Sequence, residues 1–371
     1  MVRSGGAMEE REAWLALNMV PHVGPATFAI LLERFGTAKR ILKASLKALE
    51  AVPGVGPTTA KAIRDSRVQE TVARERKRMA GRDLRFVTLR EGGYPAPLRD
   101  IPQPPPVLYH RGSWEDRDRR AVAIVGSRGA TPYGRGVADR LAFELARRGL
   151  TIVSGLARGI DAAAHRGALR AGGRTIAVLG SGADIIYPAE HRKLGEAIAE
   201  RGALLSEFPL GTSPLRGNFP QRNRLISGLC LGVVVVEAAV NSGALITADH
   251  ALEQGKEVFA VPGQVTGRLS QGCHRLIKSG AKLTEGWEDV VEELGAPYAQ
   301  DVPPMPPLPP VEGEEGRVLQ VLGEEPVHID AIIAGAKLSA STVATSLLSL
   351  EMKGWVKQLS GKTFVRVHDY R

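Results

Sequence analysis

Residues 121–161 read AVAIVGSRGATPYGRGVADRLAFELARRGLTIVSGLARGID, in which two β-branched runs, Ala121–Val125 and Thr151–Val153, flank a helical pattern. The same alternation continues toward residue 295, with further runs at Thr175–Leu179, Ala203–Leu205, Gly232–Val236 and Val258–Val261. This alternation predicts an α/β fold, a doubly wound and mostly parallel sheet with helices on both faces. The continuous apolar run Val233–Val236 is typical of a central strand that is buried on both sides.

A helical segment precedes this α/β domain, which we place at residues 84–295. Residues 8–80 contain two similar turns, at His22–Pro25 and Pro53–Pro57, and each precedes a helix. A Pro-Gly-Val-Gly turn before a helix is typical of SAM-like helix-hairpin-helix domains, because glycine lets backbone N–H groups approach a phosphate. A tight turn between packed helices is an equal alternative for the second turn and the preferred interpretation of the first.

Two segments follow the α/β domain. Residues 296–311 are rich in proline, which predicts a stiff linker. Residues 312–371 predict three short helices and a hairpin that turns at Ser360–Lys362, which is the order of a winged helix. Val343, Leu347 and Leu350 fall on one face of the third helix.

The composition favours a polyanionic partner. The 371 residues carry a formal net charge of +9, with nucleic acid the first candidate and an anionic membrane surface the second. Aromatic residues make up only 5%, which argues against a long base-stacking platform. The two cysteines fit a reducing compartment, and we find neither a signal peptide nor an apolar stretch of about 18 residues. We therefore expect a cytoplasmic protein that is not associated with a membrane.

Glycine-rich loops follow three consecutive strands of the predicted sheet. They are Gly126–Arg128, Ser154–Asp161 and Gly180–Asp184, and a basic cluster follows at Phe219–Arg224. Ligands of doubly wound sheets bind outside the carboxyl ends of the strands, where helix N-termini present free N–H groups. One such loop is more often a simple turn with a surface arginine. Several loops at one edge predict an anion site.

Residues 121–283 resemble the DprA/Smf family. The shared stretches, in order along the chain, are 123–128 (AIVGSR), 154–161 (SGLARGID) with His165, 175–180 (TIAVLG), 206–209 (SEFP), 219–224 (FPQRNR), 226–229 (ISGL), 235–238 (VVEA), 242–248 (SGALITA) and 261–263 (VPG). The chain departs from the family pattern at Gly272-Cys273-His274, where we expect Gly-x-Asn. The resemblance implies an extended Rossmann-like domain.

The resemblance also implies a function. Similar proteins bind single-stranded DNA, dimerise through this domain and load RecA recombinase during natural transformation, and a single-strand-binding protein is a further candidate partner. We expect no cofactor, no metal and no catalytic residue. The residues expected to line the pocket for DNA phosphates are Gly126, Ser127, Arg128, Ser154, Gly155, Arg158, Gly159, Phe219, Gln221, Arg222, Asn223 and Arg224, with Lys256 as a weaker candidate.

Enzymes are the main alternatives. The dinucleotide fingerprint is absent after the first strand, and Gly361-Lys362-Thr363 offers only the tail of a P-loop. A Rossmann-like nucleotide phosphoribohydrolase is the serious rival, with Glu237 as a candidate general acid or base. We prefer a structural role, in which Glu237 caps a helix or pairs with an arginine.

Two further interpretations come from single elements. Asp161 and His165 are four residues apart, so we expect Asp161 to be an N-cap and the pair to share a hydrogen bond that orients the Ser154–Gly159 loop. A transcription regulator is disfavoured, because Arg, Asn and Gln are missing between Ser339 and Leu350, on the helix that would read bases.

Overall fold

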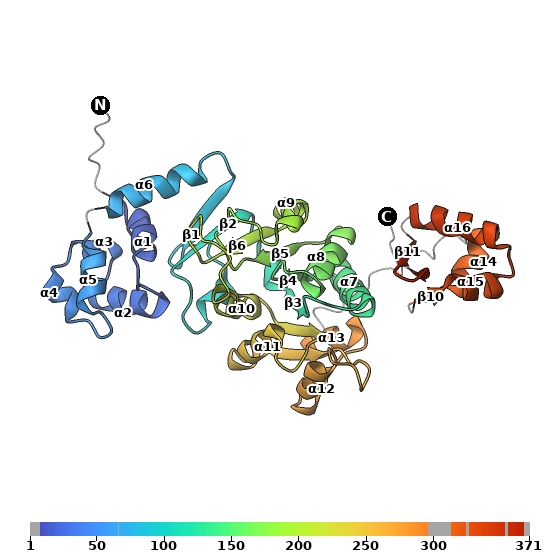
Figure 1. Ribbon diagram of the computed structural model, residues 1–371. Helices are drawn as coiled ribbons and strands as arrows, with labels where there is room; N and C mark the ends of the chain where they lie inside the picture. Colours follow the sequence, from blue (N-terminus) through green and yellow to red (C-terminus); the bar gives the residue numbers. More distant parts are fainter. Residues whose placement is uncertain (1–7, 66, 296–312, 324–325, 353–354, 367–371) are drawn as a thin grey trace.

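The computed structural model describes residues 8–65, 67–295, 313–323, 326–352 and 355–366. The linker expected at residues 296–311 lies outside these ranges. A mixed α/β domain with a mostly parallel sheet lies between an N-terminal helical unit and a C-terminal winged helix (Figure 1), which confirms the predicted fold class.

Over residues 8–65 and 67–80, the N-terminal unit contains six helices, α1 (Glu10–Asn18), α2 (Pro25–Phe35), α3 (Ala38–Lys43), α4 (Leu46–Glu50), α5 (Pro57–Ile63) and α6 (Val68–Met79). The two predicted turns precede α2 and α5, each with a glycine N-cap followed by proline. The Glu10 carboxylate accepts hydrogen bonds from the backbone N–H groups of Ala38 and Lys39, so it holds α3 against α1. This satisfies two N–H groups that a helix start leaves free.

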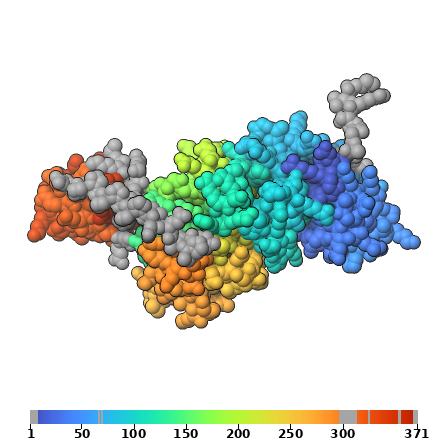
Figure 2. Space-filling view, turned by 180° about the vertical axis from the view of Figure 1, so that it is seen from behind, coloured from blue at the N-terminus to red at the C-terminus, as the bar shows by residue number. Residues whose placement is uncertain are grey.

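The hydrophobic core of the N-terminal unit continues into the sheet. Trp14 and Phe28 pack with ring centroids 4.9 Å apart, and the same core includes Phe86 of β1 (Leu84–Thr88) and Tyr109 of β2 (Val107–Gly112). Figure 2, which views the molecule from behind, shows the helices and the β1–β2 region as one continuous surface. The N-terminal unit is therefore packed onto the sheet.

Nine strands form the sheet in the order β1-β2-β6-β5-β4-β3-β7-β8-β9. Beyond β1 and β2 they are β3 (Ala121–Gly126), β4 (Thr151–Ser154), β5 (Thr175–Val178), β6 (Ala203–Ser206), β7 (Gly232–Val236), β8 (Glu257–Ala260) and β9 (Lys282–Leu283). β1, β2 and β6 pair antiparallel, whereas β6 through β9 pair in parallel. The chain progresses outward from β3 to β6 and then from β7 to β9, so strand order reverses between β3 and β7.

Helices cover both faces of the sheet. They are α7 (Pro132–Arg147), α8 (Ile160–Arg170), α9 (Arg192–Arg201), α10 (Asn218–Gly228), α11 (Gly243–Glu253), α12 (Gln271–Lys278) and α13 (Trp287–Leu294), with short 3₁₀ turns η1 (Ala96–Arg99), η2 (Asp116–Arg119) and η3 (Ala189–His191). In β7, Val234 and Val236 pack with α7 and α8, while Val233 and Val235 pack with α10 and α11. The prediction that this strand is buried on both sides is confirmed.

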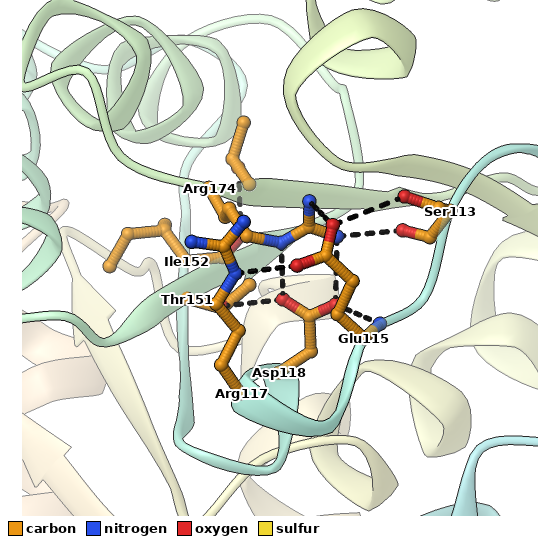
Figure 3. A network of polar contacts seen from close by, with 8 residues as sticks. Ser113, Glu115, Arg117, Asp118, Thr151, Ile152 and Arg174 are labelled. Carbon is orange, nitrogen blue, oxygen red and sulfur yellow. Dashed lines mark hydrogen bonds and ion pairs between the residues drawn. The ribbon is translucent and has the colours of Figure 1, made fainter.

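A buried ion network ties the amino ends of β4 and β5 to η2 (Figure 3). The guanidinium of Arg174 donates to both carboxylate oxygens of Asp118 at 2.8 Å and to Glu115 at 2.8 Å. The Thr151 hydroxyl donates to Asp118, and the Asp118 carboxylate is completely buried. The network thus joins three segments at the edge opposite the predicted anion site.

The winged helix comprises α14 (Gly313–Val321), β10 (Val327–His328), α15 (Ile329–Ala336), α16 (Ala340–Met352), β11 (Val356–Leu359) and β12 (Thr363–Arg366). Val343, Leu347 and Leu350 of α16 are all buried in its core, as predicted. Gly361-Lys362 forms the turn between β11 and β12, which excludes a P-loop there.

A test for helices that could span a membrane selects one bent pair of helices. Within the described ranges, none of the helices is by itself long and apolar enough to span a bilayer. Residues Ile329–Ala336 and Ala340–Glu351, bent by 108°, pass that test only when they are taken together, by length and composition.

Candidate nucleic-acid interface

The first two predicted loops touch at the carboxyl edge of the sheet, next to the point where strand order reverses. The backbone N–H of Ile160, at the start of α8, donates to the Ser127 carbonyl at 3.2 Å. Gly159 has φ +74°, and a Cβ at this position would clash with the Ser127 carbonyl oxygen. Glycine is thus required here for both the left-handed conformation and the close approach. We call the residues at this carboxyl edge, 126–128, 154–161, 180–184, 187 and 219, the rim.

Asp161 holds the second rim loop in shape. Its buried carboxylate accepts backbone N–H bonds from Gly155 at 3.1 Å and Ala157 at 3.2 Å. Burial raises the pKa of this carboxyl, while Arg222 and the N–H bonds oppose that rise. The Asp161 carboxylate thus fixes the backbone of the Ser154–Asp161 loop.

Two expectations about this pair are wrong. The N-cap of α8 is Gly159, and Asp161 already lies within the helix, where its side chain folds back to the loop. His165 does not bond to Asp161, because its Nδ1 lies 2.7 Å from the hydroxyl of Thr175. His165 therefore links α8 to β5, and Asp161 alone orients the loop.

Phe219 is the centre of the rim. It follows the first residue of α10 and packs against Gly180, where a Cβ would lie 2.8 Å from the phenyl ring. The Arg128 guanidinium lies 4.8 Å from the Phe219 ring centroid, and the Tyr187 ring lies 5.9 Å from it. Arg128 is exposed, and Tyr187 is 45% exposed. An exposed cation and two aromatic rings thus lie together outside the strand ends.

Arg222 lies beneath Phe219 and faces the interior. Its guanidinium is 6.0 Å from the Phe219 ring centroid and donates to the carbonyls of Gly155, at 3.0 Å, and Val178. The side chain is 3% exposed. Burial lowers the pKa of Arg222 to about 10, Asp161 opposes this, and Arg128 adds to it. Arg222 therefore joins the ends of β4 and β5 through its own hydrogen bonds.

The side chains of the next two residues of α10 also bond to groups within the protein. The Asn223 amide donates to the Gly243 carbonyl at 3.2 Å. Arg224 pairs with the buried Glu207 carboxylate and donates to the Gln103 carbonyl at 2.9 Å. Burial raises the pKa of Glu207, and the charge of Arg224 opposes that rise. Gln221 is exposed, and its side chain also hydrogen-bonds to Glu207.

Helical spacing is the signal that reveals this inward orientation. Arg222, Leu225, Ile226 and Leu229 are spaced i, i+3, i+4 and i+7, and all four are buried. On a helix these positions form one face. The expectation that Arg222 and Arg224 both line the pocket for phosphates is not met in the structure, because Arg222 lies on this buried face and Arg224 pairs with Glu207.

The remaining predicted residues fall into three groups. Gly126 contacts β7, since a Cβ there would clash with the Val236 carbonyl, and the Ser154 hydroxyl donates to the Ile124 carbonyl at 2.6 Å. Arg158 is 59% exposed and makes a two-pronged ion pair with Glu190, both hydrogen bonds being 2.7 Å. Lys256 precedes β8 and so lies at the amino edge, away from the rim.

Glu237 holds Thr131, the N-cap residue of α7, in place. It follows β7 with φ +53°, and its carboxylate accepts from the Thr131 backbone N–H at 2.8 Å and from the Thr131 hydroxyl at 2.5 Å. A Cβ on Gly134 would clash with this carboxylate, so glycine makes room for it. The preferred structural role is confirmed, although the N-cap itself is Thr131, and the carboxylate proposed for a hydrolase is engaged in supporting that cap.

The departure at Cys273 and His274 is structural as well. Cys273 is buried, with Sγ 3.6 Å from the Val235 carbonyl, and His274 Nε2 lies 3.0 Å from the Gly263 carbonyl. Both side chains pack α12 against the ends of β7 and β8. Tyr187, in contrast, is a rim residue that the sequence patterns do not single out.

Comparison with known proteins identifies the family. The model of the family described as DNA recombination-mediator protein A matches residues 85–295, and the DprA winged helix domain matches residues 302–362. Protein Smf from Synechocystis sp. is 37% identical over 97% of this chain and 100% of its own length. The chain belongs to the DprA/Smf family. A SAM-like helix-hairpin-helix tandem matches residues 15–67.

Other DprA/Smf proteins extend the comparison. DNA processing protein DprA from Streptococcus pneumoniae is 45% identical over 54% of this chain and 71% of its own length. The X-ray structure of that organism's DprA superposes with a TM-score of 0.67 at 34% identity, over 76% of this chain and 97% of that one. A DprA structure from Helicobacter pylori, described for its single-stranded DNA binding mode, gives a TM-score of 0.51 at 32% identity, covering 57% and 95%.

Proposed function

We propose that this chain binds single-stranded DNA at the rim, without catalysis, and acts there as a recombination mediator that protects DNA and loads RecA. The observation that carries the proposal is the group formed by exposed Arg128, half-buried Phe219 and exposed Tyr187 outside the strand ends. A guanidinium suits phosphate oxygens, and aromatic rings stack on bases of any sequence. The group is small, which fits the low aromatic content of the chain.

Charge and family membership support the same function. The net charge of +9 favours a polyanion. The Helicobacter pylori relative is described as binding single-stranded DNA. From the family resemblance we extend the proposal to four further points. They are a role in natural transformation, RecA as a partner, a homodimeric state and a cytoplasmic location.

The residues at the rim and on α10 next to it divide into two roles under this proposal. Arg128, Phe219, Tyr187 and Gln221 contact DNA, while Arg222, Asn223, Arg224 and Asp161 shape the surface from below. Gly126, Ser127, Ser154, Gly155 and Gly159 let the loops approach one another and the strand. Arg158 can bind a phosphate only if its ion pair with Glu190 breaks. Lys256 makes no contact with the rim.

Substitution of Arg128 tests the proposal. Arg128→Ala removes an exposed cation that has no role in the core, so we expect binding of single strands of any sequence to weaken by about ten-fold. The slope of log affinity against log salt should become shallower by about 0.7 for each phosphate that the variant no longer binds. Titration with single- and double-stranded oligonucleotides, with and without RecA, measures this. Unchanged single-strand affinity in Arg128→Ala would refute the rim as the DNA site.

A further inference from the structure

The N-terminal unit lies directly beside the rim, because α6 is anchored to the loop after β6. The Glu75 carboxylate accepts from the Leu210 backbone N–H at 2.7 Å, and the Arg78 guanidinium donates to the Leu210 carbonyl at 2.7 Å. Arg82 lies 3.6 Å from Asp184, the last residue of the third rim loop, and Asp184 also accepts from the backbone N–H of Gly211. One loop therefore contacts both α6 and the rim.

That loop leads from the anchor to the rim centre. Residues 211–217 read GTSPLRG, without an acidic residue, and end immediately before α10 and Phe219. The Gly182 backbone N–H donates to the Thr212 carbonyl at 2.9 Å, which ties the loop to the rim. Arg216 is exposed, and Leu215 is 62% exposed. This bridging loop offers a cation and an apolar side chain between two basic surfaces.

The far side of the bridging loop is strongly basic. Residues 61–90 hold ten Lys and Arg against four Asp and Glu. Arg74, Lys77 and Arg78 of α6 and Arg82 after it are exposed. Arg74 and Arg78 are four residues apart, so they share one face of the helix. The cations of the rim, the bridging loop and α6 thus lie on three segments that are held together by the bonds at Leu210, Thr212 and Asp184.

We propose that a single DNA strand held at the rim continues across residues 211–217 onto the exposed cations of α6, so that the N-terminal unit lengthens the DNA footprint. The proposal rests on the proposed rim function and adds a second phosphate-binding surface to it. The ligand is the sugar-phosphate backbone, because arginine and lysine side chains on a helix contact phosphates without reading sequence. Leu215 lies where it can contact a base between the two surfaces.

A length series of oligothymidylates tests the extended footprint in the full-length protein. Short strands, of about 6 nucleotides, fill the rim alone, and strands of about 30 nucleotides reach α6, given site sizes of about 4–16 nucleotides for comparable domains. The variants are Arg74→Glu with Lys77→Glu on α6, and Arg216→Glu in the bridging loop. These side chains make none of the anchoring bonds to Leu210 or Asp184, so docking of α6 is preserved.

A matched control carries the same change of charge at the opposite edge of the sheet. Arg119 ends η2 and Arg201 ends α9, both are exposed, and both precede strands at their amino ends. Arg119→Glu with Arg201→Glu therefore changes the net charge equally, away from the rim. Thermal unfolding of all variants checks that each remains folded.

We expect the wild type to bind long strands more tightly and with a steeper salt slope than short ones. The α6 and bridging-loop variants should bind long strands on the order of ten-fold more weakly, with short strands unaffected and the control variant unaffected throughout. Equal behaviour of the α6 variant and the control would overturn the extended footprint.

The remaining outcomes separate this inference from the function on which it rests. If the wild type binds short and long strands with one salt slope, the footprint ends at the rim and only the extension fails. If the wild type binds no single strand of any length, the proposed function itself fails. If an acidic polypeptide such as polyglutamate binds α6 at physiological salt while strand length has no effect, the basic surface serves a protein partner, and the extension is overturned.

Discussion

Two arginines lie near Phe219, one exposed to solvent and the other buried. Arg128 comes from the loop after β3 and remains in solvent, with its guanidinium over the ring. Arg222 comes from the buried face of α10, and its guanidinium donates to the carbonyls of Gly155 and Val178. The same side chain thus serves as a candidate ligand in one place and as a brace between strand ends in the other.

Arg222→Ala should destabilise the protein rather than act on DNA directly. Removing the guanidinium leaves the buried carbonyls of Gly155 and Val178 without this donor, and a buried polar group left unpaired costs about 1–3 kcal/mol. Urea unfolding at neutral pH measures the loss. Arg128→Ala is the control and should unfold like the wild type. An equally stable Arg222→Ala protein would contradict the bracing role.

His165 makes the stability of the protein sensitive to mild acid. Burial holds the pKa of His165 at about 3, below the ordinary 6.5, so the folded protein keeps the ring neutral. Between these two values the unfolded chain binds a proton that the folded protein does not. The free energy of unfolding therefore falls as pH drops below 6.5, by up to about 1.4 kcal/mol per pH unit from this group.

The contribution of His165 can be isolated by substitution. His165→Gln cannot take up a proton, so its urea midpoint should fall less than that of the wild type between about pH 7 and about pH 5. The effects of the other histidines and carboxylates cancel in this comparison, because these groups are the same in both proteins. Parallel losses of stability in the two proteins would assign the acid sensitivity to other groups.

At the scale of elements, the rim depends on how closely two strand-to-helix loops approach. Gly159, with φ +74°, lets α8 begin against the carbonyl groups of Ser127 and Arg128. Gly159→Ala should cost more than the roughly 1 kcal/mol of a left-handed backbone alone, because the methyl group must push the loops apart. Single-strand affinity should fall with it.

Gly172→Ala is the matched control for this effect. Gly172 has φ +69° just after α8, and nothing lies within 4 Å of a Cβ there. Both glycines have a positive φ, but an added methyl group at Gly172 meets no neighbour, so the loops at the rim are not displaced. Thermal unfolding and oligonucleotide titration of both variants decide the matter. Identical stability and DNA affinity in the two variants would show that the close approach of the loops at Gly159 is unimportant.

At the scale of the whole molecule, the rim and the winged helix are separate candidates for DNA contact. Deleting residues 302–371 leaves every rim contact in place, so single-strand affinity should stay within a factor of about 3. Length-matched titrations of the full-length and shortened proteins test this. Loss of all DNA binding on deletion would transfer the interface to the winged helix and overturn the assignment to the rim.

Most of the fold could be predicted because it rests on local patterns. The strand runs, the glycine-rich loops after them and the apolar face of α16 all follow from periodicity and turn chemistry. β1 and β2 escape such a pattern, since they join the sheet as an antiparallel pair that the N-terminal helices cover. Their place depends on contacts between distant segments.

The sequence by itself determined a parallel sheet whose glycine-rich loops end at one edge, because strand direction and loop chemistry are properties of short segments. Only the tertiary structure decided which charged groups remain available there. Arg222, Arg224 and Glu237 are drawn into internal bonds, whereas Arg128 and Tyr187 are left in solvent. The reason is that a buried charge must find a partner, and the partner comes from a segment that only folding brings near.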